Sequence, residues 1–329
     1  MPDVAFLAYE QCMLSGISSL MDAFGIANEW LKHFVRREGT PATEDAFFRT
    51  EIVTPGGRPI TAQGGIPLSP HRAMEEVKST DLVLIPPHMF GVRHDREQIG
   101  DMLDWLVMHH QANARIGALC TGTFILAMTG LLDGRIATTN WQLVNRFRRQ
   151  FPKVRLKPER VLTEDGGLIC SGAVTAAYNL GLYVMELFGS PELMRACSKA
   201  LLVDPSRTTQ APYMTASFKK NHGDKAILAA QEWMEEHFME GVTMEDAADH
   251  VGLSSRHFKR RFKQAVEETP LNYLQQVRLE AAKKALETTT DNIDEITRQV
   301  GYEDASTFRR LFKKHTTLSP REYRDKFAI

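Results

Sequence analysis

Four cationic side chains in the last third of the sequence are spaced to lie on one face of a helix: Arg256, Lys259, Arg260 and Lys263. Residues three and four apart are neighbours on a helix surface, so this spacing predicts one continuous cationic stripe. Phe258 and Phe262 are also four apart and fall on another side, where they would face a hydrophobic core. Ammonium and guanidinium groups bind phosphates, and the fork of an arginine matches the O6 and N7 atoms of guanine. The chemistry that this stretch suggests is DNA binding.

The same arrangement occurs again 50 residues later. Phe308 and Phe312 repeat the phenylalanine pair, and the stripe beside them consists of Ser306, Arg309, Arg310 and Lys313. A charged helix face is most often only solvated surface. Two basic helices that each follow a glycine-containing turn, at Gly252 and Gly301, are difficult to explain by solubility alone. The repeat therefore predicts two helix-turn-helix units.

A cysteine in the first part of the chain lies where a predicted strand turns into a helix. Cys120 follows the apolar run 114–119 and precedes a helical pattern that starts near Gly122. A helix N-terminus lowers the pKa of a thiol, and the nucleophiles of several α/β enzymes occupy such turns. The more usual role of a cysteine in an apolar stretch is that of a small core residue. The residue types alone leave both interpretations open.

Composition limits the kind of protein that can carry these sites. The 329 residues suffice for two or three domains, and 43% hydrophobic and 25% charged residues are ordinary for a globular protein. The formal net charge is −1, but residues 251–329 contain 16 Lys/Arg against 11 Asp/Glu and carry a net +5. Four scattered cysteines predict a reducing compartment, without a disulfide framework and without a metal site. No run is long enough to span a membrane and no signal peptide precedes Val4, so a cytoplasmic protein is expected.

Alternating strands and helices must position Cys120. Short apolar runs alternate with helical patterns over the first two-thirds of the chain, and the predicted strands are 4–8, 48–53, 81–86 and 114–119. Continuous apolar strands that alternate with helices predict a parallel sheet covered on both faces. A hairpin within 161–170 and two closing helices complete this α/β sandwich. Such folds bind ligands beyond the carboxyl ends of their strands, which is where Cys120 falls.

The sequence GALCTGTFILAMTGLLDGRIATTNW, residues 117–141, resembles the elbow segment of the class I glutamine amidotransferase-like, or PfpI-type, superfamily. It is most similar to the version that is fused to AraC-type regulators, the GlxA-like proteins. The resemblance implies a flavodoxin-like domain that is often dimeric, with Cys120 at the elbow.

The sequence departs from the enzymes of that superfamily at each group that assists the cysteine. Asn140 replaces the histidine of the family's T-T-H-W pattern, and Thr121 stands where the peptidase branch has a histidine. The stretch 15–19 lacks the acid that enzymes place near their first helix, and 86–88 (Pro-Pro-His) replaces their glycine-rich loop. A nucleophile needs a base and a stabilised oxyanion. No catalytic residue is therefore assigned: Cys120 is interpreted as a degenerate elbow, with His88 as the one remaining candidate base.

A sheet-end pocket that has lost its catalytic partners is best interpreted as a ligand pocket. Its predicted lining residues are Cys120, Thr121, Asn140 and Trp141. An amide and an aromatic wall suit a small polar or quaternary-ammonium solute. A core anchor is the alternative role for Trp141. The GlxA-like resemblance implies a small nitrogenous metabolite, such as an amino acid or a betaine, as effector, and no cofactor.

The last third resembles the AraC/XylS DNA-binding domain over about residues 225–326. The resemblance is carried by the P-x-x-Y boxes at 270–273 and 320–323 and by the signature at 301–308. It implies two recognition helices in successive major-groove segments, set by a linking helix over 271–286. By position, the residues that reach bases are Arg256, Lys259, Arg260, Ser306, Arg309 and Arg310. The residues expected to contact phosphates are Arg261, Lys263, Lys313 and Lys314.

The predicted organisation is therefore an α/β flavodoxin-like effector and dimerisation domain (1–204), a linker (205–223) and an all-α DNA-binding domain (224–329). The two helix-turn-helix units are expected at about 244–265 and 293–315. The leading hypothesis is a bacterial, cytoplasmic and nucleoid-associated homodimer that binds double-stranded promoter DNA. It would act as an activator through RNA polymerase under control of the metabolite. The alternative is a cysteine-dependent hydrolase or deglycase, or a thiol redox sensor, acting through Cys120.

Overall fold

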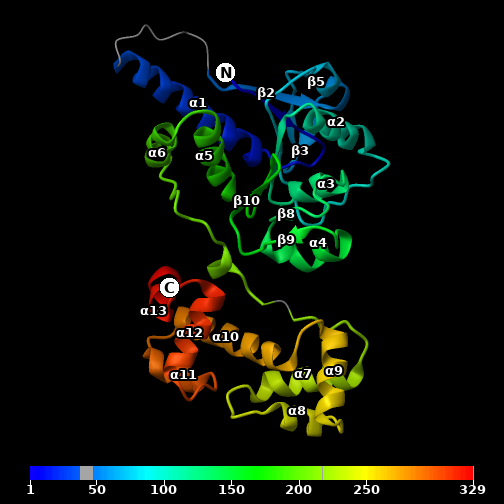
Figure 1. The fold of residues 1–329 in the computed structure, drawn as a ribbon, viewed down its shortest axis with the longest axis vertical. Coiled ribbons are helices and arrows are strands. Elements are labelled where there is room, and N and C mark those ends of the chain that lie inside the picture. Colours follow the sequence, from blue (N-terminus) through cyan, green and yellow to red (C-terminus); the bar gives the residue numbers. More distant parts are fainter. Residues whose placement is uncertain (38–46, 217, 329) are drawn as a thin grey trace. The chain divides into compact units, whose positions relative to one another are not determined.

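The chain folds into an α/β unit and a helical unit (Figure 1). The computed structural model describes residues 1–37, 47–216 and 218–328. The chain divides into Met1–Gln210 and Ala211–Ile329. The α/β unit is built on one hydrophobic core and the helical unit on two.

A seven-stranded sheet forms the centre of the α/β unit, in the order β10-β11-β7-β6-β1-β2-β5. Its strands are β1 (Asp3–Leu7), β2 (Arg49–Thr54), β5 (Arg72–Ala73), β6 (Leu82–Ile85), β7 (Arg115–Leu119), β10 (Leu162–Asp165) and β11 (Leu168–Ser171). β10 and β11 pair antiparallel, and all other neighbours in this sheet are parallel. Every residue of β6 is buried, which explains why its sequence is an uninterrupted apolar run. The predicted parallel sheet with an added hairpin is confirmed.

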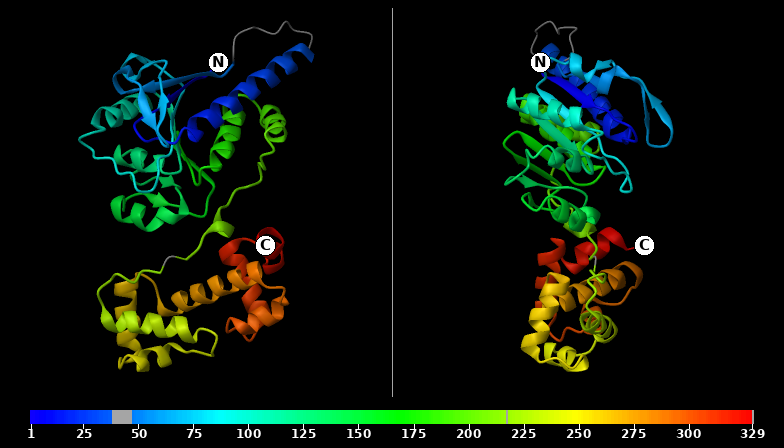
Figure 2. Two further views of the ribbon diagram at one scale, coloured as in Figure 1. Left: turned by 180° about the vertical axis from the view of Figure 1, so that it is seen from behind. Right: turned by 90° about the vertical axis from the view of Figure 1, so that its right-hand side faces the viewer.

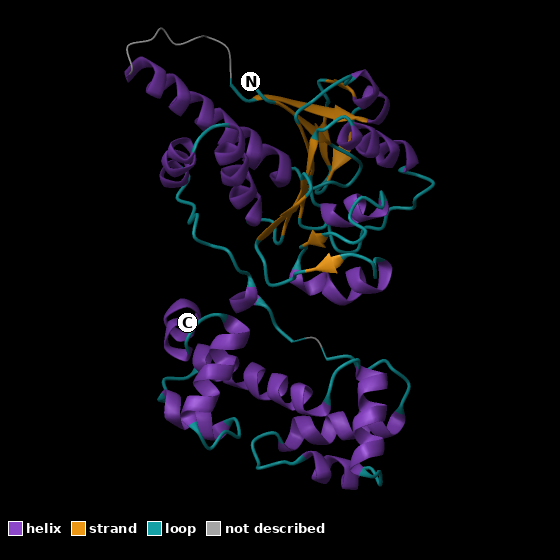
Figure 3. Ribbon diagram, viewed as in Figure 1, coloured by secondary structure: helices purple, strands orange, loops and turns teal. Residues whose placement is uncertain are grey.

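Helices cover both faces of this sheet, as the purple ribbons on either side of the orange strands show (Figure 3). On one face α1 (Ser15–Arg37), α5 (Ala176–Phe188) and α6 (Pro191–Ala200) pack against one another, and on the other α2 (Gly100–Gln111) packs against α3 (Gly122–Met128). The view from behind also shows the sheet between the two helical layers (Figure 2, left). The predicted sandwich is therefore confirmed.

Several short elements lie outside the sequence prediction. They are β3 (Ile60–Ala62), β4 (Ile66–Leu68), β8 (Ile136–Ala137), β9 (Arg155–Leu156), α4 (Val144–Gln150) and the 3-10 turns η1 (Pro55–Gly57), η2 (Met74–Glu76) and η3 (Trp141–Leu143). β3 and β4 form an antiparallel pair, and β8 and β9 form a parallel pair. Segments of two to seven residues are too short to show a helical or strand periodicity.

Seven helices make up the described part of the helical unit. They are α7 (Lys225–His237), α8 (Met244–His250), α9 (Ser255–Val266), α10 (Pro270–Thr288), α11 (Ile293–Gln299), α12 (Ala305–Thr316) and α13 (Pro320–Phe327). Each begins at a polar side chain that caps a backbone N–H. At α8, Thr243 and Asp246 form the complete capping box that their spacing predicts. None of the helices in the described ranges is both long and apolar enough to cross a membrane.

The sequence repeat corresponds to a structural repeat in which α10 is used twice. Tyr273 and Leu274, near the start of α10, belong to the core of the first copy, whereas Ala282 and Leu286 belong to the core of the second. The hydroxyl of Tyr273 donates to Glu235 on α7. Equivalent contacts recur in the second copy, where the hydroxyl of Tyr323 donates to Glu287 at 2.7 Å. α10 is thus the last helix of one copy and the first helix of the other.

The segment predicted as a linker, 205–223, is divided between the two units. Gln210 is 2% exposed and buried in the α/β unit. The next residues form a 3-10 turn, η4 (Ala211–Tyr213), whose first two residues are buried in the helical unit. Its polar composition conceals these contacts, because two of the residues that make them, Gln210 and Tyr213, are themselves polar or amphipathic.

Candidate DNA-binding surface and effector site

The first predicted recognition helix is α9, and its fold places the cationic stripe in solvent. The Ser254 hydroxyl caps the helix by accepting from the His257 N–H. Phe258 and Phe262 are fully buried and lie 5.5 Å apart, edge to face. With these rings in the core, the predicted stripe is exposed on the opposite side: Arg256, Lys259, Arg260 and Lys263.

The second predicted recognition helix, α12, repeats this geometry. The Asp304 carboxylate caps it by accepting from the N–H groups of Ser306 and Thr307. Phe308 and Phe312 are buried at 5.6 Å from each other. The equivalent stripe is again exposed and consists of Ser306, Arg309, Arg310 and Lys313. Both helices therefore present to solvent the side chains that the sequence assigns to DNA.

One cation in each stripe is held by an acid from the preceding helix of the same unit. Lys259 Nζ lies 3.3 Å from the Glu245 carboxylate, and Arg309 lies 2.7 Å from Asp294. These pairs occupy equivalent positions in the two copies. Because both pairs are exposed to solvent, they contribute little to stability. Their effect is to fix the direction of two side chains on the surface that would meet DNA.

Arg261 is engaged within the helical unit, and its predicted phosphate contact stays a prediction. Its guanidinium binds Asp224 with both arms, at 2.6 and 2.9 Å. Asp224 is the N-cap of α7, so the bidentate pair fastens α7 to α9. The side chain of Arg261 therefore has a structural role, which the 37 residues between the partners hide from any local pattern.

The structure places Cys120 at a strained elbow. Its backbone φ is +52°, in the left-handed region that side chains other than glycine rarely adopt. The N–H of Cys120 donates to Ser171 at 3.0 Å, and its carbonyl accepts from the Thr139 hydroxyl at 2.8 Å. At Gly122 an added Cβ would lie 2.7 Å from the Ile85 carbonyl oxygen, so the turn is pressed against the end of β6. The predicted strand-to-helix elbow is present in the fold.

The thiol at this elbow is not activated. Cys120 is 1% exposed, and burial raises the pKa of its thiol to about 11. The Asn140 amide nitrogen, 3.8 Å from Sγ, lowers that pKa only in part. The expected lowering by the helix N-terminus is therefore wrong here: removal of the thiolate from water outweighs the dipole of a seven-residue helix.

The other predicted ligand-binding residues differ in their contacts. The Thr121 hydroxyl donates to the carbonyl of His88 and accepts from its N–H, both at 2.7 Å, so both functions of the hydroxyl are already used. Asn140 is 8% exposed, and its Oδ1 caps η3 by accepting from Gln142 N–H. Trp141 is half-buried at the first position of η3. Asn140 is thus the polar side chain that the structure places directly at the Cys120 sulfur.

His88 is adjacent to the elbow but is engaged elsewhere. Its Nδ1 lies 3.0 Å from the Met89 carbonyl oxygen, and its ring meets that of His94 edge to face at 4.9 Å. Burial lowers the pKa of His88 below its ordinary value. At Gly16, an added Cβ would lie 2.3 Å from Pro87, so that position of α1 has no room for an acidic side chain. Among the described residues, the side chain that hydrogen-bonds to the Cys120 sulfur is the Asn140 amide and not a base.

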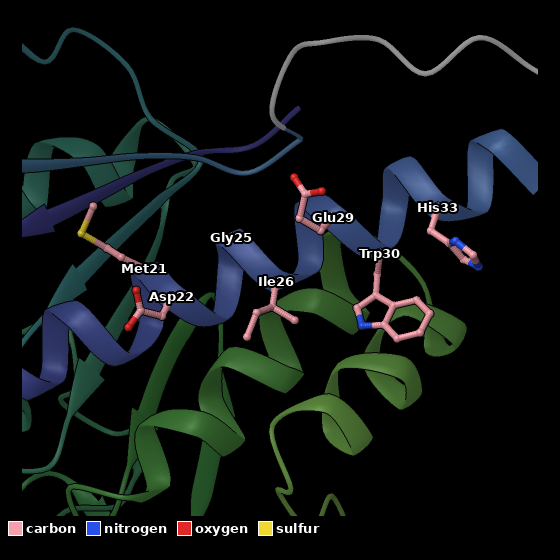
Figure 4. Close-up of a pocket in the computed structure, with 7 residues that line it drawn as sticks. All are labelled: Met21, Asp22, Gly25, Ile26, Glu29, Trp30 and His33. Atoms are coloured by element: carbon pink, nitrogen blue, oxygen red, sulfur yellow. The ribbon is translucent and has the colours of Figure 1, made fainter.

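Sequence reasoning missed a groove along the outer side of α1. It has a volume of about 650 Å³, and the residues that line it are Met21, Asp22, Gly25, Ile26, Glu29, Trp30 and His33 (Figure 4). Nothing lies within 4 Å of the position that a Cβ of Gly25 would occupy. A signal was present in the sequence, because these residues recur at intervals of three and four beside the core positions of the same helix.

Two families match the chain, one in each unit. Residues 29–187 match the DJ-1/PfpI family, and residues 247–326 match a helix-turn-helix domain. The chain is similar to the HTH-type transcriptional regulator CdhR of Pseudomonas aeruginosa, with 24% identity over 84% of this chain and 82% of that protein. It is also similar to the HTH-type transcriptional regulator GlxA of Rhizobium meliloti, with 27% identity over 63% of this chain and 64% of that protein.

A solved structure agrees with the fold of the α/β unit. The AraC family transcriptional regulator from Pseudomonas putida matches with a TM-score of 0.51 and 16% identity, over 61% of this chain and 100% of that chain. The fold and the two family matches define a transcription regulator in which a DJ-1/PfpI-type domain is joined to a helix-turn-helix domain. These two matches, together with the similarity to GlxA, confirm the resemblance to AraC-type regulators of the GlxA-like kind that the motifs predict.

The buried thiol leads to a first testable expectation. With a pKa of about 11, only about one Cys120 in 10⁴ is a thiolate at pH 7. Iodoacetamide should therefore leave Cys120 unmodified at pH 7 in the native protein, and labelling should increase as the pH approaches 11. Peptide mass spectrometry after timed quenching measures this, with urea-unfolded protein as the reference. Rapid labelling of native Cys120 at pH 7 would show that the thiol is activated after all.

Proposed function

We propose that the protein is a sequence-specific transcription activator that binds promoter DNA as a homodimer and responds to a small nitrogenous metabolite. The observation that carries the DNA-binding part is the pair of exposed basic helices, α9 and α12, each backed by two buried phenylalanines. Both helices pack on the shared helix α10 or on neighbours held by it. An arrangement of this kind suits two successive major-groove segments, about 34 Å apart.

The contacts proposed for each stripe follow from side-chain chemistry. Arginine recognises guanine through two parallel hydrogen bonds, so Arg256, Arg260 and Arg310 are assigned to base edges. Lys263 and Lys313, at the far end of the stripes, are assigned to phosphates. Lys259 and Arg309 would exchange their acidic partners for DNA. The first stripe has Arg256 where the second has Ser306, so the two half-sites should differ in sequence.

Selection of bound duplexes from a random library tests this assignment. The full chain should enrich a site with two conserved segments about one helical turn apart, and footprinting should show protection on one DNA face. Purified RNA polymerase and a promoter that carries the selected site then test activation. Enrichment of a single short segment would contradict the two-helix assignment.

The effector site is assigned to the surroundings of the Cys120 elbow. Asn140 supports this assignment because its amide lies at the sulfur and its carbonyl oxygen caps the following turn. A buried thiol that has a raised pKa and is hydrogen-bonded by an amide, not by a base, favours ligand binding over catalysis at this position. Amino acids and glycine betaine, screened by thermal shift on the full chain, are the probes for the ligand.

Substitution of Asn140 separates effector response from DNA binding. Asn140→Ala should reduce the thermal shift caused by any amino acid or betaine that stabilises the wild type, because it removes the amide at the sulfur. Affinity for the selected duplex in the absence of that compound should not change. Asn179→Ala, at a partly buried position of α5, is the matched control for loss of an amide. An undiminished shift in Asn140→Ala would place the effector site elsewhere.

Dimerisation is assigned to the groove of α1, with a second copy of the chain as its occupant. A symmetric dimer pairs the same surface of both subunits. We place the two α1 helices antiparallel, with Trp30 of each copy over Gly25 of the other. In this register Asp22 of each copy lies beside His33 of the other. The open space at Gly25 can receive the indole, and the acid and the imidazole are complementary in chemistry.

A charge exchange tests that register. Asp22→Lys should weaken the dimer, and the double variant Asp22→Lys/His33→Asp should restore it, as measured by sedimentation equilibrium of the full chain. Gly25→Gln fills the open space at Gly25 and should also weaken the dimer. The same substitution should stabilise the helix itself by about 0.5–1 kcal/mol, because glycine has a low helix propensity. A dimer unaffected by Gly25→Gln would place the interface on another surface.

A further inference from the structure

Gln210 is the last residue of the α/β unit, and its buried side chain lies among backbone carbonyls. Its Nε2 is within hydrogen-bonding distance of the carbonyl oxygens of Pro158 at 2.7 Å, Thr139 at 3.0 Å and Arg160 at 3.2 Å. The hydroxyl oxygen of Thr138 is a fourth acceptor, at 3.4 Å. The carboxamide therefore lies between two separate segments of the α/β unit, 138–139 and 158–160, at the point where the chain leaves that unit.

This side chain is not held in one fully satisfied arrangement. A carboxamide nitrogen has two hydrogens, so at most two of the four acceptors receive a well-directed hydrogen bond at one time. Its oxygen, Oε1, is buried and has no hydrogen-bond partner among the described residues. A buried carbonyl without a partner is unfavourable, because the loss of its hydration is not compensated. A small shift of any of these segments would therefore change which hydrogen bonds the amide makes.

Two of the groups around the amide also hold the Cys120 elbow. The carbonyl of Thr139 accepts from Gln210, and the hydroxyl of the same residue donates to the carbonyl of Cys120 at 2.8 Å. On the other side, an added Cβ at Gly172 would lie 2.6 Å from Nε2 of Gln210. Gly172 follows Ser171, whose carbonyl accepts from the N–H of Cys120. A displacement of the elbow would reach Gln210 through either contact.

The residues that follow Gln210 are fixed in the helical unit without an intervening spacer. In η4, Ala211 and Pro212 are buried, and the ring of Tyr213 meets that of Phe327 edge to face at 5.2 Å. The buried Lys283 of α10 donates from Nζ to the carbonyl of Met214 at 2.7 Å. η4 packs against α12, the second predicted recognition helix. Gln210, which is buried in the α/β unit, and Ala211, which is buried in the helical unit, are therefore adjacent in the sequence.

We propose that Gln210 is a positioning residue that couples the Cys120 elbow to α12 through η4. The inference rests on the proposed effector control, because it specifies the route by which occupancy of the elbow would bias DNA binding. Coupling of two sites is reciprocal, so DNA bound by the helical unit must alter the elbow as strongly as the elbow alters DNA binding. This reciprocity allows a test without the effector.

Hydrogen exchange in the full chain, with and without a duplex selected by the same protein, measures the coupling. In the wild type, saturating duplex should change the exchange rates of amides in 138–143 and in the elbow, 120–122, by about fivefold or more, the lower end of ordinary allosteric coupling. Gln210→Leu keeps the bulk but removes the donors, so it should abolish this change while leaving duplex affinity intact. Thr209→Val is the matched control: it removes one hydrogen bond to Glu159 in the same segment and should preserve the change.

A second variant makes the outcome independent of the stability of Gln210→Leu. Thr139→Val removes the hydroxyl that binds the Cys120 carbonyl, keeps the carbonyl that binds Gln210, and should confine the duplex effect to 139–143. Unchanged exchange at the elbow of the wild type with duplex bound, or a full response in Gln210→Leu, would overturn the coupling. Absence of any selected duplex would contradict the proposed function itself, and is seen before exchange is measured.

Discussion

Replacement of Arg310 by alanine should weaken binding to the selected duplex by about 5- to 150-fold, since a bidentate arginine–guanine contact provides about 1–3 kcal/mol of discrimination. The side chain is exposed on α12, one turn beyond the Asp304 cap, and two residues from the buried Phe308 and Phe312 on either side. Its removal should therefore affect recognition without disturbing the core. The loss should be much larger for the selected sequence than for an unrelated duplex.

Fluorescence anisotropy with both duplexes, at several salt concentrations, provides the measurement. Arg321→Ala is the matched control, because Arg321 is an exposed arginine on α13 that belongs to neither stripe. It removes the same charge and should change affinity for both duplexes alike. Arg310→Lys should recover phosphate attraction but not the discrimination of a planar fork. Equal losses on the two duplexes in Arg310→Ala would reassign Arg310 to the DNA backbone.

Phe312→Ala should destabilise the second helix-turn-helix copy by about 3–5 kcal/mol, the usual cost of emptying a buried phenylalanine site. Phe312 is fully buried and contacts Phe308 and Tyr323 with ring centroids 5.6 and 5.3 Å away. The core of this copy is small, so few neighbours can move to fill the cavity. DNA affinity should decline with it, because α12 is positioned by this core.

Native-state hydrogen exchange of α11–α13, compared with that of α8 and α9, resolves this effect from the rest of the chain. Phe312→Leu is the conservative control and should cost clearly less. Protection of the α/β sheet should be unchanged in both variants. A loss of protection that is equal in both copies would show that α10 transmits the defect and that the copies unfold together.

The sequence was sufficient for features that repeat or that depend on neighbours along the chain. The spacing of Phe258 and Phe262 identified the buried side of α9, and Thr243 with Asp246 located the start of α8. The continuous apolar strands identified the parallel sheet. Each of these follows from a local period or a capping distance, which is why each could be predicted.

Features that depend on distant partners could not be predicted in this way. Burial of Cys120 arises because strands and loops from several parts of the chain close over the elbow, so its raised pKa has no local signature. The pairing of Arg261 with Asp224 joins residues that are 37 positions apart, so no local pattern predicts it. The role of Gln210 as an anchor was hidden in a composition typical of linkers. In each case the contacts that decide the outcome join residues that are distant in the sequence and close in the fold.

The double use of α10 has a consequence for the promoters that this protein can recognise. A rigid helix of 19 residues, about 28 Å long, sets the distance between α9 and α12 and also their angular phase. Insertion of one residue into α10 would rotate α12 relative to α9 by about 100° and advance it by about 1.5 Å. If α9 and α12 bind DNA as proposed, the spacing and angular phase of their two half-sites depend on the length of α10. The bases within each half-site could then vary independently, whereas a change of phase would require a change in the length of this helix.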